Sequence, residues 1–127
     1  MTMKLEVVPV PVADVDRARD FYVKQVGFNL DFDHQQTDTL RVVQLTPPGS
    51  ACSIVIGTGL GEISEMKPGT VKGLHLVVPD ISATRDMLIS RGVEVGEIIT
   101  YPREIKFASF HDPDGNLWML QEIPPGL

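Results

Sequence analysis

Two segments of the chain carry recurring positions at helical spacing. The first runs from Asp14 to Gly27 and the second from Asp80 to Gly92. The recurring positions are Val15, Ala18, Phe21 and Tyr22 in the first segment, and Ile81, Thr84, Met87 and Leu88 in the second. An aspartate at the start can accept hydrogen bonds from the first free amides of a helix, and a glycine at the end can take the left-handed conformation that closes it. The pattern predicts two helices, each with one apolar face.

Apolar runs bounded by turn residues predict strands around these helices. One run leads into each helix, beginning near Val8 and Leu74, and three runs follow it. The following runs are 26–32, 39–45 and 51–56 in the first half, and 93–99, 106–110 and 117–123 in the second. A turn rich in proline and glycine precedes the last strand of each half, at 47–50 and 113–116. The polar residues 33–38, which include His34, predict a solvated loop.

The two halves repeat with a constant offset. Asp80 lies 66 residues after Asp14, and Gly115 lies 66 residues after Gly49. Each half therefore predicts a βαβββ module, the first over residues 1–56 and the second over 73–127, with a linker at 57–72. We expect a single α+β domain over 1–127. In it the helices cover one side of the strands, and the other side forms a curved mixed sheet around a shared cavity.

Composition narrows the possible partners. The 127 residues are 43% hydrophobic and 22% charged, as in ordinary globular proteins. A net charge of −6 with scattered basic residues argues against a nucleic acid or an anionic membrane as partner. The single cysteine, Cys52, allows no internal disulfide. Glu6 and Pro9 interrupt the first apolar run, which suits neither a signal peptide nor a membrane span, so we expect a cytoplasmic protein.

Three short stretches resemble one known superfamily. They are FYVKQVGF at 21–28, SRGVEV at 90–95 and DPDGN at 112–116, set within the doubled pattern. Together they resemble the vicinal-oxygen-chelate superfamily, which includes glyoxalase I, extradiol dioxygenases, fosfomycin-resistance enzymes and bleomycin-resistance proteins. The resemblance covers essentially the whole chain and implies the paired-module fold. It does not imply one activity, because function depends on the site.

For the enzymes of that superfamily, the resemblance implies a divalent metal held between the modules by His, Gln or Glu side chains of the first and last strands. The corresponding positions here carry Val7, Ser53, Gly73 and Met119. Valine and glycine offer no donor, a neutral serine hydroxyl is a weak ligand, and a methionine thioether suits soft copper(I). We therefore expect a member of the superfamily that lacks the usual metal ligands and has no cofactor.

The polar residues nearest to these emptied positions lie two residues further along the second module. They are His75 and Gln121, and strand alternation places them on the faces of the two emptied positions. Their counterparts in the first module, Pro9 and Val55, cannot bind a metal. His75 is either a structural histidine bonded to nearby backbone or a hydrogen-bond donor or general base to a ligand.

Other polar and aromatic residues are placed by the same alternation. Trp118 and Glu122 fall on the face opposite Met119, which predicts a core position beneath a helix for Trp118 and a solvated or edge position for Glu122. The pattern does not decide whether Arg41 or Gln44 points inward. The residues expected at the rim of the cavity, beside the connection 100–104, are Tyr101, Arg103 and Phe107.

The sequence favours metal-independent binding of a small, largely apolar or aromatic molecule in the cavity between the modules, as in the sequestering proteins of the bleomycin-resistance type. The predicted apolar lining is Val7, Pro9, Val55, Val77, Leu117 and Met119, and the predicted polar points are Ser53, His75 and Gln121. The resemblance also implies a homodimer. The alternative is a glyoxalase-like lyase or isomerase, either metal-free with His75 as the acid–base group or with a rebuilt metal site.

Overall fold

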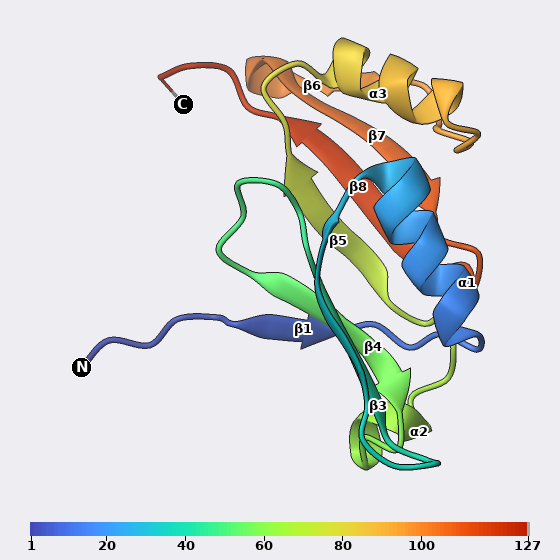
Figure 1. The fold of residues 1–127 in the computed structure, drawn as a ribbon. Coiled ribbons are helices and arrows are strands. Elements are labelled where there is room, and N and C mark those ends of the chain that lie inside the picture. Colours follow the sequence, from blue (N-terminus) through green and yellow to red (C-terminus); the bar gives the residue numbers. More distant parts are fainter. Residues whose placement is uncertain (127) are drawn as a thin grey trace.

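The chain forms two four-stranded mixed sheets, one in each half (Figure 1). The computed structural model describes residues 1–126. The first half contains β1 (Val7–Pro9), α1 (Val15–Asp20), the π-helical segment η1 (Phe21–Val26), β2 (Asn29–Gln35), β3 (Arg41–Thr46) and β4 (Ser53–Thr58). The second half contains β5 (Lys72–Val77), α3 (Ile81–Ser90), β6 (Ile99–Tyr101), the 3₁₀ turn η2 (Pro102–Glu104), β7 (Ile105–His111) and β8 (Leu117–Glu122). A short helix, α2 (Glu62–Glu65), lies between the halves.

The two sheets have the same topology. Their strand orders are β1-β4-β3-β2 and β5-β8-β7-β6. In each sheet the first strand runs parallel to the last, and the other neighbours are antiparallel. The predicted α+β architecture of two tandem modules is confirmed. Because β1 and β5 are edge strands, each leaves one side without a strand partner in its own sheet.

The predicted start of each helix and the predicted glycine at the end of the first are confirmed. The Asp14 side chain accepts a hydrogen bond of 3.0 Å from the backbone N–H of Arg17, and Asp80 does the same for Ala83. At the other end, Gly27 takes the left-handed conformation, with φ of 96°. A side chain is disfavoured there for two reasons, because a Cβ on Gly27 would be strained and would also lie 3.0 Å from Nη1 of Arg91.

Three strand predictions need correction. The strand expected at 26–32 begins at Asn29 instead, because Val26 still belongs to the last turn of η1. It then runs to Gln35, so His34 lies in an exposed edge strand, not in a loop. Of the predicted strand 93–99, only residue 99 lies in a strand, because β6 runs over Ile99–Tyr101 into the predicted connection, and Val95 makes an isolated bridge. The Arg85 side chain instead donates to the carbonyl oxygens of residues 95 and 96.

An aromatic core joins η1 to the second sheet. Tyr22, Phe110 and Trp118 are at most 2% exposed. The rings of Phe28 and Trp118 meet edge to face with centroids 5.6 Å apart, and those of Phe110 and Trp118 stack at 6.2 Å. The predicted core position of Trp118 is confirmed. Because η1 belongs to the first half and Trp118 to the second, the two modules share one core.

A buried polar cluster also connects the halves, at the turn between β7 and β8. The Asp112 carboxylate accepts hydrogen bonds from the Tyr22 hydroxyl at 2.7 Å and from Asn116 Nδ2 at 2.8 Å. Asn116 also donates to the carbonyl oxygen of Pro11 at 2.9 Å and accepts from the backbone N–H of Val71 at 3.1 Å. We call Tyr22, Asp112 and Asn116 the Asp112 cluster. Besides closing a turn, it ties both modules to the segment between them.

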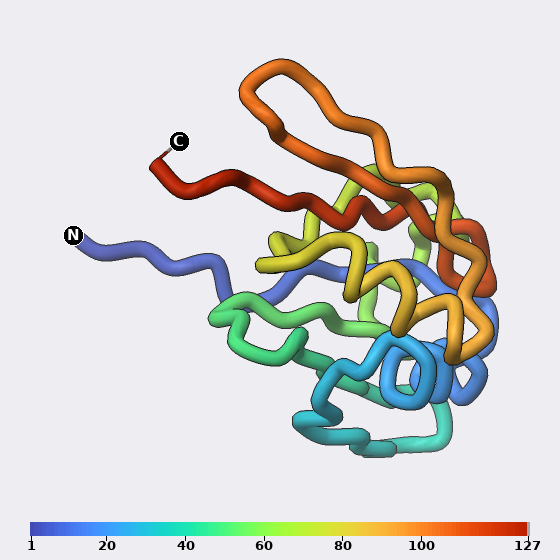
Figure 2. The backbone as a smooth tube through the Cα atoms, turned by 90° about the horizontal axis from the view of Figure 1, so that it is seen from above, coloured from blue at the N-terminus to red at the C-terminus, as the bar shows by residue number. Residues whose placement is uncertain are grey.

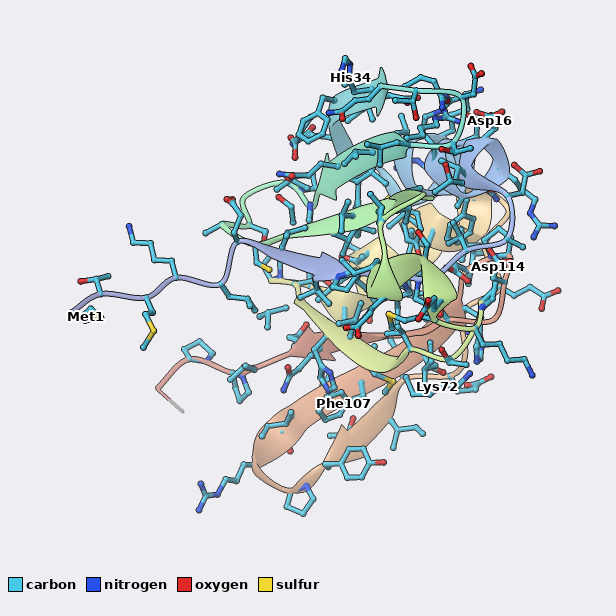
Figure 3. All side chains as sticks on the ribbon, turned by 90° about the horizontal axis from the view of Figure 1, so that it is seen from below. Met1, Asp16, His34, Lys72, Phe107 and Asp114 are labelled. Carbon is cyan, nitrogen blue, oxygen red and sulfur yellow. The ribbon has the colours of Figure 1, made fainter. Side chains whose placement is uncertain are left out.

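The segment before β1 extends away from the sheets, and Figure 3 shows Met1 at its far end. Met1, Met3 and Leu5 are 115%, 88% and 70% exposed. In an extended chain, alternate residues lie on one side, so these three form an apolar edge. Figures 1 and 2 show the carboxyl-terminal segment leaving the body on the same side. Among residues 1–126, no helix is long and apolar enough to cross a membrane.

Candidate functional site

The predicted site residues lie on the face of each sheet that is turned away from the core, which we call the outer face. On the second sheet, His75 pairs with Met119, and the next pair on the same face is Val77 with Gln121. Their neighbours Leu76 and Leu120 alternate to the other side, where Leu120 is 1% exposed. The alternation that groups His75 with Gln121 is therefore confirmed.

The remaining predicted residues lie on the outer face of the first sheet. Val7 pairs with Ser53, and Pro9 pairs with Val55. Ser53 and Val55 are 5% and 9% exposed, so this part of the face is more covered than the outer face of the second sheet. The site residues are thus divided between two sheets.

Aromatic side chains gather on the outer face of the second sheet. Phe107 pairs with Gln121 on one side and with Ile99 on the other, and Figure 3 shows it on the strand ribbon. Its ring meets the His75 ring at 5.7 Å and the Tyr101 ring at 5.6 Å, edge to face in both cases. We call His75, Tyr101 and Phe107 the aromatic triad. Phe107, expected at a rim, lies in the middle of the face.

The alternation of side chains along β7 is the signal that would have placed Phe107 on the outer face. Ala108 and Phe110 are buried at 2% and 1% exposure, so the alternate residue Phe107 must point outward. Tyr101 and Ile99 on the neighbouring strand are about half exposed, at 51% and 53%. A set of aromatic rings that is held in place but still reaches solvent can bind a flat apolar molecule.

The His75 ring has a defined orientation. Its Nδ1 lies 2.6 Å from the carbonyl oxygen of Gly73. A carbonyl oxygen can only accept, so Nδ1 carries the proton in this contact and Nε2 of the neutral ring is left as an acceptor. The bond fits the structural interpretation of His75, and the unprotonated Nε2 fits the interpretation as a base. The two interpretations are therefore compatible in one residue.

A chain of hydrogen bonds crosses the outer face of the first sheet. Gln44 Nε2 donates to Ser53 Oγ at 3.3 Å, and Ser53 Oγ lies 2.5 Å from Thr46 Oγ1. Thr46 in turn donates to the carboxylate of Asp31. Because the carboxylate only accepts, the hydroxyl of Thr46 is directed at Asp31 and that of Ser53 at Thr46. Sequence reasoning found Ser53 and missed Asp31 and Thr46, which only strand pairing brings to it.

The same sheet settles which of Arg41 and Gln44 faces outward. The Arg41 guanidinium lies 2.8 Å from Asp33 and 2.8 Å from Asp16 of α1, so it points toward the helix. Gln44 pairs with Val55 and bonds to Ser53, so it points to the outer face. The sequence could not decide this because both residues are polar and neither is fully buried.

Two cavities border His75. One, of about 350 Å³, lies between the Pro47–Ser50 turn and residues 75–77 of β5. A smaller one, of about 100 Å³, has both Ser53 and His75 in its lining. One predicted polar residue from each module, Ser53 and His75, therefore borders the same cavity. Neither lining includes Met119 or Gln121, which lie further along the outer face.

The residues at the family's metal positions do not fit a metal. Val7 and Gly73 have no side-chain donor, and the Ser53 hydroxyl is already engaged with Thr46. Within residues 1–126, no group of three or more His, Cys, Asp or Glu side chains is arranged to hold a metal ion. The Glu122 carboxylate lies on the core side, where it accepts a hydrogen bond from the backbone N–H of Ile81 at 2.8 Å.

Two solved structures and one further protein are similar to this chain over most of its length. The solved structure of TnmS3, an antibiotic-binding protein from Streptomyces sp. CB03234, is 35% identical, with a TM-score of 0.84 over 97% of this chain and 98% of that one. A glyoxalase/bleomycin resistance protein/dioxygenase superfamily member from Sphaerobacter thermophilus DSM 20745 is 31% identical, with a TM-score of 0.82 over 95% and 98%. The uncharacterized protein YetH of Bacillus subtilis (strain 168) is 28% identical over 96% of this chain and 100% of its own.

The family model agrees with these relatives. It matches residues 4–120, a stretch that spans most of both modules and includes the Asp112 cluster and the aromatic triad. The repeated topology, the emptied metal positions and the outer-face residues are therefore features of one family member: this chain belongs to the Glyoxalase/Bleomycin resistance protein/Dioxygenase superfamily.

Proposed function

We propose that this protein binds a small, largely apolar or aromatic molecule on its outer sheet faces, without a metal. The observation that carries the proposal is the aromatic triad, in which Phe107 contacts both His75 and Tyr101 at the centre of an exposed face. Aromatic rings with solvent access offer apolar area at low entropic cost, and binding sites are typically apolar with a few placed polar groups. His75 Nε2 and the Gln121 amide supply those polar groups.

The relatives support a binding role. TnmS3, at 35% identity, is described as an antibiotic-binding protein. The donor set at the emptied metal positions supports metal independence, since Val7 and Gly73 can contribute nothing to a cation. The ligand class that fits the face is a planar ring system that covers the triad and carries an acceptor or donor within reach of Gln121.

The functional unit of this proposal is a homodimer. Each chain has two outer faces and four edge strands, of which β1 and β5 begin the two modules. The segment before β1 presents Met1, Met3 and Leu5 to solvent, and burial of these side chains against a second copy would remove apolar area from water. A second copy that faces the aromatic triad would also enclose a ligand that a single sheet leaves open on one side.

Metal-free catalysis is a second candidate, and the His75 geometry is the observation that favours it. With Nδ1–H bound to the Gly73 carbonyl oxygen at 2.6 Å, Nε2 is available to take a proton from a ligand on the face. A His75→Ala variant distinguishes the two functions. In the binding case the wild type does not turn over the bound compound, and the variant only loses affinity. In the catalytic case the wild type turns the compound over, and at a saturating concentration of that compound the variant does not.

The test of binding is a thermal-shift screen of antibiotics and polycyclic aromatic compounds, with and without EDTA, followed by calorimetry on each hit. A specific ligand raises the melting temperature by mass action. We expect Phe107→Ala to weaken binding about ten-fold, as loss of one stacking ring does elsewhere, and Ile89→Ala, an exposed residue of α3, to leave it unchanged. Binding that EDTA abolishes, or that Phe107→Ala leaves intact, would overturn the proposal.

A further inference from the structure

A third cavity lies on the helix side of β5, between the two modules. Its volume is about 390 Å³, which is in the range of small-molecule sites. The end of η1 and the Pro47–Pro48 turn form one wall, and α3 with β5 and β8 forms the other. The apolar lining consists mainly of Val26, Phe28, Leu76, Val78, Met87 and Leu120.

The cavity is distinct from the aromatic triad. Strand β5 separates them, because Leu76 alternates with His75 and Leu120 alternates with Gln121. The cavity therefore faces mainly side chains of the shared core, and the triad lies on the outer face of the second sheet. The two regions are neighbours, because Leu76, Val77 and the Pro47–Pro48 turn line both this cavity and the cavity of about 350 Å³ beside His75. No residue of the triad is in the lining.

Arg91 is the one charged residue in this lining. Its Nη1 lies beside Gly27, at 3.0 Å from where a Cβ would stand, so the guanidinium sits at the cavity wall near the end of η1. Among the residues that the structure describes, Arg17, Arg19 and Arg41 each form an ion pair. The guanidinium of Arg91 forms none there, and the only other polar lining side chain, Thr84, already donates to the carbonyl oxygen of Asp80 at 3.0 Å.

We propose that this cavity is a second binding site, for a small amphiphilic carboxylate whose apolar body fills the cavity and whose carboxylate pairs with Arg91. A guanidinium offers two parallel N–H donors that match a carboxylate. Arg91 is an exposed residue, so its guanidinium is solvated when the cavity is empty. An uncharged apolar ligand would gain nothing from that cation, and a cationic ligand would be repelled by it. The proposal does not depend on the function of the outer faces.

The test compares naphthalene-2-carboxylate with naphthalene-2-carboxamide, which has the same ring system and no charge. Affinities are measured by calorimetry, and the site is located by amide chemical-shift changes in ¹⁵N-labelled protein. We expect the carboxylate to bind the wild type about ten-fold more tightly, as expected for a charge-assisted hydrogen bond. The shifts should centre on Gly27, Val78 and Met87.

Variants test whether Arg91 causes the preference for the carboxylate over the carboxamide. Arg91→Gln should bring the carboxylate down to the affinity of the carboxamide and leave the carboxamide unchanged, whereas Arg91→Lys should keep most of the preference. Lys24→Gln, which removes an exposed cation from the neighbouring η1, is the charge-matched control. Met87→Trp should fill the cavity and weaken both compounds, and its melting temperature shows whether it is folded.

Phe107→Ala separates this site from the aromatic triad, because it should leave carboxylate binding unchanged. Equal affinity of the two compounds for the wild type would overturn the proposal. So would a full preference for the carboxylate in Arg91→Gln, or shift changes confined to the outer face around His75 and Phe107.

Discussion

The hydroxyl of Tyr22 donates a hydrogen bond of 2.7 Å to Asp112, a residue of the other module. The same hydroxyl accepts a hydrogen bond of 2.9 Å from the indole N–H of Trp118. Burial raises the pKa of Tyr22 well above its ordinary value, and the adjacent Asp112 carboxylate raises it further. The phenol is therefore neutral at neutral pH and keeps its proton for the hydrogen bond to Asp112.

Replacement of Tyr22 by phenylalanine should destabilise the protein by about 1–3 kcal/mol, the cost of leaving a buried polar partner unpaired. Trp118 would lose its acceptor, while Asp112 would keep the bond from Asn116. The measurement is the free energy of unfolding in urea. Tyr101→Phe is the matched control, because Tyr101 is 51% exposed. A Tyr22→Phe variant as stable as that control would contradict the role of the Asp112 cluster.

The Glu122 side chain should contribute to stability by capping α3. Its Oε1 accepts from the first helical N–H, at Ile81, at 2.8 Å. Glu122→Ala should cost about 1 kcal/mol, as loss of a capping acceptor does. Glu122→Gln keeps an amide oxygen at the same place and should cost less, since it loses the favourable charge at the helix start and the 3.9 Å ion pair with Lys106 but not the capping acceptor. Equal unfolding free energies for the two variants would exclude a capping role.

Asp33 should make stability depend on pH in the acid range. Hydrogen bonds from Arg41 and then Arg19 lower the pKa of Asp33 to about 2, below the ordinary value of 3.8, although partial burial opposes this. A carboxyl with a lowered pKa in the folded state stabilises it above the ordinary pKa, and this stabilisation is lost as the pH falls toward the folded-state pKa.

Asp33→Asn should therefore be less stable than the wild type by about 1 kcal/mol at neutral pH. The difference should hold down to a pH of about 4 and shrink as the pH falls toward 2. Urea unfolding at several pH values measures it, with Asp38→Asn as the control at an exposed position. A difference that persists at pH 2 would mean that the interactions with Arg19 and Arg41 are not its source.

The segment before β1 should control self-association. Leu5→Asp places a charge on the apolar edge formed by Met1, Met3 and Leu5, and we expect it to raise the dimer dissociation constant at least ten-fold. Thr2→Asp adds the same charge on the other side of the extended segment and is the control. Sedimentation velocity gives both constants. A wild type that stays monomeric at tens of micromolar would exclude the homodimer.

The sequence predicted those features that depend on nearby residues. The caps at Asp14 and Asp80 follow from helical spacing, and the core position of Trp118 follows from strand alternation. The π-helical turns of η1 were not predicted, and they displaced the start of β2. The widened helix holds Phe21, Tyr22 and Val26 against the core, so Val26, which the sequence placed at the start of a strand, still belongs to the helix.

The contacts that organise the site connect distant residues, so local patterns could not reveal them. Tyr22 and Asp112 are 90 positions apart, and Asn116 and Pro11 are 105 apart. Asp31 reaches Thr46 only because a bulge in β2 shifts the register near it. The emptied metal positions were visible in the sequence, but the aromatic triad requires the phase of β7, which burial determines.

The Asp112 cluster also shows that equivalent positions in the two modules have different roles. The residue 66 positions before Asp112 is Thr46, which belongs to the hydrogen-bond chain on the outer face, and the residue 66 positions after Tyr22 is Leu88. The Asp112 cluster therefore occurs once in the chain, although the βαβββ module occurs twice. Two copies of the first module joined in tandem would repeat its strands and helices but would lack the Asp112 cluster that connects the modules. The two halves of the chain are therefore not interchangeable.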